Sequence, residues 1–221
     1  MNETTKTRRL WGKLEQSILT GSGIDIGCGP DPVKPDVRRF DVAQGDANEI
    51  TNYVHEEFDY VFSSHCLEHM HNPRRAILGW WKLVRVGGHL IFIVPDEDLY
   101  EQGVFPSRFN PDHKATFTIA KHRSWSPVSV NVLDLALSLP NSQLVSLVLQ
   151  DEGYDRRLLK HGNIAAHGLT QKLLRLDSAM KRRTGINLKL MQALASHYTV
   201  VDQTLSSNVL AQIQCIVKKL A

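Results

Sequence analysis

The sequence predicts an α/β fold built on a doubly wound, mostly parallel sheet. Three observations lead to this class. Residues 21–29, Gly-Ser-Gly-Ile-Asp-Ile-Gly-Cys-Gly, form a short apolar strand that runs straight into a glycine turn. Residues 58–64 and 90–94 are apolar runs of strand length, and a segment with helical periodicity lies between them. A continuous apolar run is typical of a strand that is covered on both faces, as in parallel sheets.

The 221 residues fit one domain with insertions, and 42% of them are hydrophobic. We expect a single domain over 1–221, with a loop insertion at 96–125 and a basic helical insertion at 152–200. No apolar run approaches the roughly 20 residues that span a bilayer, and the polar start shows no signal peptide.

The cysteines are odd in number and widely spaced, at Cys28, Cys66 and Cys215. This pattern forms neither a disulfide framework nor a metal-binding motif. It therefore predicts a cytoplasmic protein without a metal site.

The first half of the expected fold begins with a helix over about residues 8–19 and a strand at 23–26. Residues 30–36 are proline-rich and predict a loop, because proline interrupts a regular helix. A second strand over 37–42 ends near Asp41.

The helix after the 58–64 strand has a clear start, with Asn72 as N-cap and Pro73 at the first helical position. Its apolar face consists of Ile77, Trp80, Trp81 and Val84, and we expect Gly87-Gly88 to end it.

In the second half, Ser126-Pro127 predicts the opening of another helix. Strands are expected at 143–150 and 209–217.

The glycine turn is the best candidate for a ligand site. Gly27 and Gly29 lack Cβ atoms, so a ligand can lie directly against the backbone. Asp25 precedes them in the strand, and Pro32 stands where a dinucleotide fingerprint requires a third small residue. The pattern therefore disfavours a nicotinamide dinucleotide.

The acid-x-Gly-x-Gly form resembles the first motif of class I S-adenosylmethionine-dependent methyltransferases. Residues 59–69, Asp-Tyr-Val-Phe-Ser-Ser-His-Cys-Leu-Glu-His, look like the family's fourth strand and the turn after it. Residues 84–95 are similar to its helix-turn-fifth-strand segment. The resemblance covers roughly residues 20–96. It implies a Rossmann-like fold whose last strand lies antiparallel between the fifth and sixth, and S-adenosylmethionine as cofactor.

The resemblance also implies a set of cofactor-binding residues. The acid of the turn would help to hold the methionine end, Asp41 would accept from the ribose hydroxyls, and Asp46 would accept from the adenine amine. Asp41 has the alternative of a surface turn acid, because the segment between the two acids is shorter than in the family. The full set is Asp25, Gly27, Cys28, Gly29, Asp41, Asp46, Ala47, Ser64 and His65.

Candidates for catalysis are His113, in the long loop, and His65, after the 58–64 strand. Either would act as a base if the acceptor carries a proton that must leave. For Glu68 and His69 we expect a structural role at the start of the next helix. The loop's aromatic residues are Tyr100, Phe105, Phe109 and Trp125, and its candidates for holding an anionic acceptor are Arg108, Lys114, His122 and Arg123.

Residues 156–189 carry nine Lys and Arg against one acid, although the whole chain has a net charge of only +3. Two interpretations stand: a solvated face, or contact with an anionic partner such as a membrane surface. An apolar stripe within this segment, Leu169, Leu173, Leu176 and Met180, would pack on the domain, form a dimer contact or meet lipid. No nucleic acid is expected, because the basic residues lack interleaved aromatics.

The sequence therefore predicts a cytoplasmic enzyme that transfers a methyl group from S-adenosylmethionine to an oxygen or nitrogen of a small polar acceptor. Sugar or glycan-type molecules and anionic metabolites are the acceptor candidates. The alternative is a catalytically silent, methyltransferase-like binding subunit.

Overall fold

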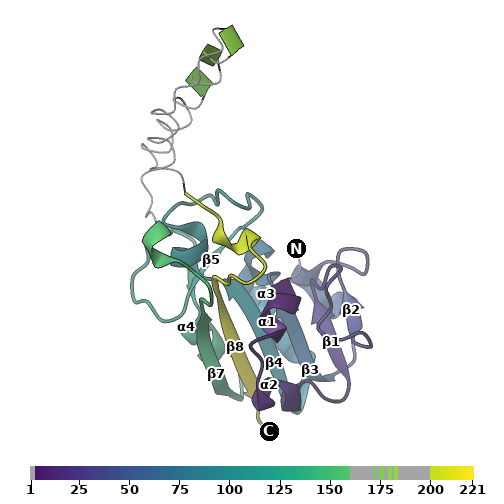
Figure 1. Cartoon of the computed structure of the whole chain (residues 1–221). Helices are drawn as coiled ribbons and strands as arrows, with labels where there is room; N and C mark the ends of the chain where they lie inside the picture. Colours follow the sequence, from purple (N-terminus) through teal and green to yellow (C-terminus); the bar gives the residue numbers. More distant parts are fainter. Residues whose placement is uncertain (1–2, 160–171, 173–174, 177–178, 181, 184–199) are drawn as a thin grey trace.

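A six-stranded sheet in the order β2-β1-β3-β4-β8-β7 organises the chain (Figure 1). The computed structural model describes residues 3–159, 172, 175–176, 179–180, 182–183 and 200–221. The strands of this sheet are β1 Gly23–Ile26, β2 Arg38–Phe40, β3 Phe58–Ser64, β4 Val84–Pro95, β7 Ser142–Gln150 and β8 Gln212–Lys219. A second sheet pairs β5 Thr116–Thr118 with β6 Ser129–Asn131 in parallel.

Strand direction agrees with the expected fold class. Strands β1, β2, β3 and β4 pair in parallel, whereas β8 runs antiparallel to both of its neighbours, β4 and β7. The implied position of an antiparallel last strand, inserted between the two strands that precede it in the sheet, is confirmed.

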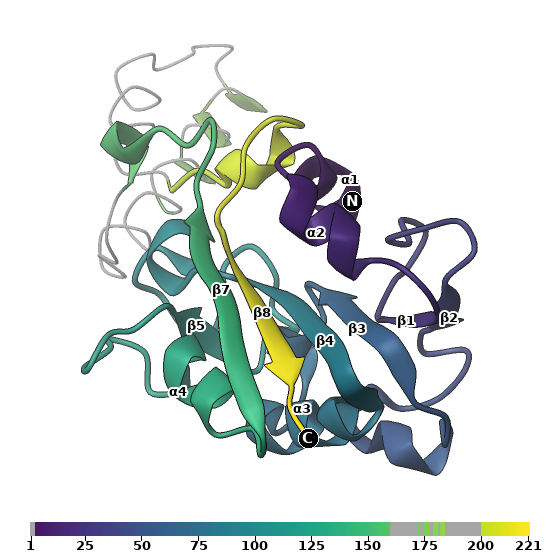
Figure 2. The same ribbon diagram turned by 90° about the horizontal axis from the view of Figure 1, so that it is seen from below.

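Helices cover both faces of the sheet, as Figure 2 shows. The helices are α1 Glu3–Arg8, α2 Lys13–Ile18, α3 Pro73–Lys82 and α4 Val132–Leu137. Helices α3 and α4 lie on one face over a large core that contains Trp80, Val61 and Phe92. On the other face Ile18, at the end of α2, packs in a smaller core with Tyr60. The alternation of residues along β3 and β4 supplies both cores, so the sheet is doubly wound.

Short helical turns lie in the segments that connect these strands and helices. Among the described residues they are the 3₁₀ turns Ala47–Asn52, Leu67–His69, Arg156–Leu158 and Gln203–Leu205 and the π-helical turn Glu97–Glu101. The loop at 30–36 contains no helix or strand, as its prolines predicted.

The start of α3 is confirmed in detail. The Asn72 side chain accepts a hydrogen bond from the Arg75 amide at 3.1 Å, and Pro73 occupies the first turn. Trp80 is fully buried, and its indole N–H donates to the Ala47 carbonyl at 2.9 Å. This bond fastens α3 to the segment that follows β2.

Two predicted helix boundaries were wrong. The expected helix over 8–19 is not continuous: α1 ends at Arg8, and α2 begins only at Lys13, after Gly12 adopts an extended conformation and caps it. Helix α3 ends at Lys82, and Gly87-Gly88 lies inside β4. A Cβ on Gly88 would lie 2.7 Å from the Asp59 carbonyl oxygen, so this glycine permits close approach of β3 to β4 and does not end a helix.

The prediction that Ser126-Pro127 opens a helix was also wrong. The chain first forms β6, and Asn131 then caps α4 by accepting from the Asp134 amide at 3.0 Å. The last strand begins at Gln212, three residues later than expected.

No helix among the described residues is long and apolar enough to cross a membrane. Most of the predicted basic insertion, including Leu169 and Leu173 of its apolar stripe, lies outside the described residues. The two described members of the stripe, Leu176 and Met180, are exposed.

Candidate active site

The glycine turn follows β1 at the edge of the sheet where the parallel strands end. Gly27 and Gly29 have positive φ angles of 72° and 51°, which side-chain-bearing residues rarely adopt. A Cβ on Gly27 would lie 2.5 Å from the Cys66 side chain, so only glycine fits there. A Cβ on Gly29 would meet nothing within 4 Å, because this glycine faces open space.

Two aspartates fix the shape of this turn. Asp25 is buried and accepts from the Val33 amide at 2.6 Å, which ties the proline-rich loop to β1. Asp41 accepts from the Gly29 amide and from the Val42 amide, both at 2.8 Å. Burial raises the pKa of Asp25 to about 7, although the Val33 amide favours its ionised form.

Two cavities meet at this turn. We call the first the histidine cavity, with a volume of about 360 Å³, and the second the aspartate cavity, with about 590 Å³. Both are lined by Gly27, His65 and His69, so they are adjoining parts of one site. Volumes of this size are typical of small-molecule and cofactor sites.

Each cavity has its own set of walls. The histidine cavity is completed by Glu3, Thr4, Cys28, Gly29, Pro30, Asp31, Ser64, Glu68, Tyr100, Phe109, Asn110, His113, Asp202, Thr204, Leu205, Ala211 and Gln212. The aspartate cavity is completed by Asp41, Val42, Gly45, Asp46, Ala47, Tyr53, Cys66, Met70 and Asp112.

The charge of these walls is one-sided. No Lys or Arg lines either cavity among the described residues, whereas seven acids do: Glu3, Asp31, Glu68, Asp202, Asp41, Asp46 and Asp112. Such walls favour a cationic or neutral ligand and disfavour a pyrophosphate. The predicted anion-holding residues Arg108, Lys114, His122 and Arg123 line neither cavity.

Asp46 and Ala47 stand at the far end of the aspartate cavity. Asp46 caps the turn that follows it by accepting from the Asn48 amide and from its side chain, both at 2.8 Å. These bonds hold the pKa of Asp46 below its usual range. They engage one carboxylate oxygen and leave the other to accept from a ligand.

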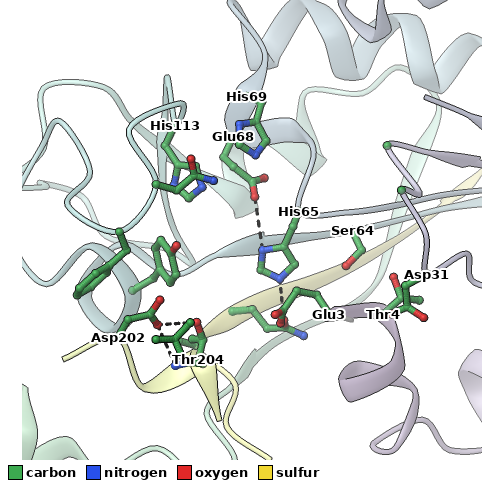
Figure 3. Close-up of a pocket in the computed structure, with 18 of the residues that line it drawn as sticks. Glu3, Thr4, Asp31, Ser64, His65, Glu68, His69, His113, Asp202 and Thr204 are labelled. Carbon is green, nitrogen blue, oxygen red and sulfur yellow. Dashed lines mark hydrogen bonds and ion pairs between the residues drawn. The ribbon is translucent and has the colours of Figure 1, made fainter. Parts of the chain in front are cut away.

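His65 stands between the two cavities. Its Nε2 donates to the Gln212 side-chain oxygen at 2.9 Å, because the Gln212 amide nitrogen already donates to two other acceptors. Its Nδ1 lies 3.4 Å from Glu68 (Figure 3). Burial favours the neutral ring, but the contacts with Glu68 and Gln212 outweigh it and raise the pKa of His65.

His113 and His69 form the opposite wall, and each is paired with a carboxylate. His113 Nδ1 lies 2.7 Å from Glu101, and both side chains are buried. His69 Nδ1 lies 2.9 Å from Asp112 at the cavity rim. These bonds fix Nδ1 of each ring as the donor, so Nε2 of each ring carries the free lone pair.

The structure brings most of the predicted site residues together. Gly27, Cys28, Gly29, Ser64, His65 and His113 line the histidine cavity, and Asp41, Asp46 and Ala47 line the aspartate cavity. Asp25 is the exception, because it lies beneath the turn and lines neither cavity.

Sequence reasoning missed several wall residues. Glu68 and His69, expected to have only a structural role, line the histidine cavity. Glu101 gave no signal, since its contact with His113 depends on the turn at 97–101. Of the loop's predicted aromatic walls, Tyr100 and Phe109 line the cavity, and their rings meet edge to face with centres 5.6 Å apart.

Comparison with known proteins gives the class. Residues 30–92 match a family model described as a methyltransferase domain. The match confirms the resemblance of the segments that follow the glycine turn to methyltransferases, and the turn itself, at 27–29, lies just before the matched residues. Residues 30–92 thus resemble a methyltransferase domain, and S-adenosylmethionine is the cofactor of the class that they resemble.

Solved structures with a similar fold have low sequence identity to this chain. An S-adenosylmethionine-dependent methyltransferase from Archaeoglobus fulgidus is 14% identical, with a TM-score of 0.49 over 99% of this chain and 95% of that one. A phosphoethanolamine N-methyltransferase from Haemonchus contortus is 11% identical, with a TM-score of 0.47 over 97% of this chain and 53% of that one. No curated protein sequence matches the chain.

The residues present fit S-adenosylmethionine. The open space at Gly29, the acidic walls and the junction of the cavities at Gly27 suit an elongated ligand with positive charge on its sulfonium and ammonium groups. Asp46 and Ala47 would then hold the adenine end. Cys28, Gly29 and Ser64 would hold the methionine end, where the buried Ser64 hydroxyl has no partner among the described residues.

Proposed function

We propose that this methyltransferase acts on a hydroxyl oxygen of a neutral, polar acceptor, with a sugar hydroxyl as the first candidate. The observation that carries the proposal is the wall residue His113 of the histidine cavity, whose ring is held from behind by the buried Glu101. When bound beside His113, S-adenosylmethionine supplies an activated methyl group on its sulfonium. Loss of this methyl group leaves a neutral thioether.

A hydroxyl acceptor needs a base because it keeps its proton at neutral pH, whereas many amines do not need one. Glu101 holds the Nδ1 proton of His113, so Nε2 accepts the proton that the hydroxyl loses. His65 is less suited to this role, because its Nε2 donates to Gln212 and its Nδ1 faces Glu68.

The walls also support a neutral acceptor. The histidine cavity has acidic groups but no Lys or Arg among its described lining residues, so a phosphorylated or carboxylated acceptor would lack a counter-charge there. Tyr100 and Phe109 offer an aromatic surface on which the apolar face of a sugar ring can pack.

The test is an acceptor screen that measures S-adenosylhomocysteine formation with neutral glycosides, sugar phosphates and amines of matched size. We expect turnover of neutral hydroxyl acceptors, and a loss of about 10²–10⁴-fold in H113Q, the usual range for removal of a general base. The exposed His122, which lines neither cavity, gives the control variant H122Q.

Preference for amines or anionic acceptors, or full activity of H113Q, would contradict the proposal. Binding of S-adenosylhomocysteine without turnover of any acceptor would favour the silent binding subunit instead.

A further inference from the structure

Three potential metal ligands meet on the acceptor side of the histidine cavity. Glu68, His69 and His113 each present one ligand atom, and these atoms all lie within 4.8 Å of one another. In Figure 3 the two imidazoles lie beside the Glu68 carboxylate. The sequence spacing gave no hint of this group, because His113 lies far along the chain from the other two residues.

Both imidazoles are oriented by a carboxylate behind them. Glu101 holds Nδ1 of His113 at 2.7 Å, and Asp112 holds Nδ1 of His69 at 2.9 Å. A metal-binding histidine almost always donates its other ring N–H to a carboxylate, a carbonyl or water in this way, which fixes the tautomer and turns Nε2 towards the ion. The arrangement occurs twice in this one cluster.

The third ligand, Glu68, is a buried carboxylate that lacks hydrogen bonds. It is 1% exposed, and neither of its oxygens accepts a hydrogen bond from the described residues. The nearest cationic group is His65, whose Nδ1 is 3.4 Å away. A buried carboxylate with one imidazole contact at 3.4 Å and no hydrogen bond from the described residues keeps much of its desolvation cost, which a bound cation would offset.

The spacing of the rings fits one shared ion. An ion 2.0–2.1 Å from Nε2 of two imidazoles in tetrahedral geometry places the ring centres about 5 Å apart. The ring centres of His69 and His113 are 5.0 Å apart. Tetrahedral ligand atoms lie about 3.4 Å from one another, so the side chains need to close by at most about 1.4 Å.

Backbone hydrogen bonds hold the two ligand-bearing segments together. The Lys114 and Ala115 amides both donate to the Glu68 carbonyl, at 2.8 and 3.2 Å. His113 is therefore fixed beside Glu68 and His69 by the chain itself, without help from an ion.

We propose that Glu68, His69 and His113 bind one divalent first-row transition ion, with Zn²⁺ as the reference case. Two imidazoles and one carboxylate are donors that such ions accept, whereas Mg²⁺ prefers oxygen ligands alone. Three protein ligands leave a coordination position open towards the cavity.

The catalytic consequence rests on the proposed function. An acceptor hydroxyl bound at the open position would lose its proton to solvent more readily, as metal-bound water does. Nε2 of His113 would then be a metal ligand and could not act as the base. Metal ligand and general base are therefore alternative roles for this nitrogen.

The test is a titration of the chelator-treated full chain with Zn²⁺ by calorimetry, and with Co²⁺ by visible absorption. We expect one ion per chain. Glu68→Gln, His69→Gln and His113→Gln should each weaken binding by at least about 100-fold, and Glu101→Gln, which acts through His113, by about 10–100-fold. His71→Gln, an exposed histidine near the cluster, is the matched control and should bind as the unsubstituted chain does.

S-adenosylhomocysteine binding, measured in the same samples, shows that each variant is folded. Failure of the folded chain to bind Zn²⁺ or Co²⁺ stoichiometrically would overturn the proposal, as would binding that all three ligand variants leave unchanged. A folded chain that binds no metal but methylates neutral hydroxyl acceptors would refute the ion and keep the proposed function. A chain that binds the metal but does not methylate hydroxyl acceptors would keep the metal site and refute the proposed function.

Discussion

Asp25 makes the stability of the protein depend on pH in a direction opposite to that of most acids. Burial raises the pKa of Asp25 from 3.8 to about 7 in the fold. Between these two values the folded protein retains a proton that the unfolded chain has lost. The free energy of unfolding therefore falls as pH rises through this window and levels off above about pH 7.

Replacement by asparagine removes this effect while keeping an acceptor for the Val33 amide. Each pH unit inside the window is worth about 1.36 kcal/mol, and about two units separate pH 5 from the pKa of Asp25. We therefore expect D25N to be more stable than the unsubstituted chain, with an advantage that grows by about 2–3 kcal/mol between pH 5 and pH 8.

The assay is urea unfolding followed by tryptophan fluorescence at pH 5, 6, 7 and 8, without cofactor. Other groups titrate over the same range, but they cancel in the difference between the two proteins. D134N, at an exposed acid on α4, is the control and should show a flat difference. A pH-independent difference for D25N, or one that shrinks as pH rises, would refute the argument.

Three further predictions concern the glycine turn and the first turn of α3. Gly27→Ala should cost about 1–3 kcal/mol of stability, because its Cβ would lie 2.5 Å from Cys66 at a positive φ. Gly29→Ala has space for its Cβ and bears only the strain of a positive φ, so it should lower the melting temperature less than Gly27→Ala does, yet lose S-adenosylhomocysteine affinity. Thermal melts with calorimetry separate the two effects, and equal melting temperatures of the two variants would contradict the steric argument. Asn72→Ala removes the acceptor of the Arg75 amide and should cost about 1 kcal/mol in urea unfolding, whereas no loss would show that water replaces the cap.

Local signals in the sequence were enough to predict the parts of the fold that local chemistry decides. Asn72 and Pro73 mark the start of α3 because the cap and the fixed φ act within one turn. The strand at Gly23–Ile26 was predicted with its observed bounds because its apolar run ends at a turn that only glycine can make. Gly88 was misread because its function depends on a carbonyl of the neighbouring strand, which the sequence does not place.

The candidate site divides in the same way. The turn at 27–29 could be found because its two glycines stand one residue apart directly after an apolar strand, and its resemblance to a known motif supplied the cofactor. The cluster of Glu68, His69 and His113 could not, since it depends on two backbone bonds from the loop to the Glu68 carbonyl. Glu101 reaches His113 only through the path of an irregular turn.

The order of the sheet also constrains how the chain can be made. Among the described strands, β7 pairs with β8 alone, and about 60 residues separate the two in the sequence. At typical rates of synthesis, β7 leaves the ribosome roughly 3–12 s before its partner exists. During that interval the β4 edge is unpaired as well, because β8 covers it too. A stalled ribosome or a nonsense codon before residue 212 would thus release a product with two open strand edges, which invites aggregation or capture by a chaperone.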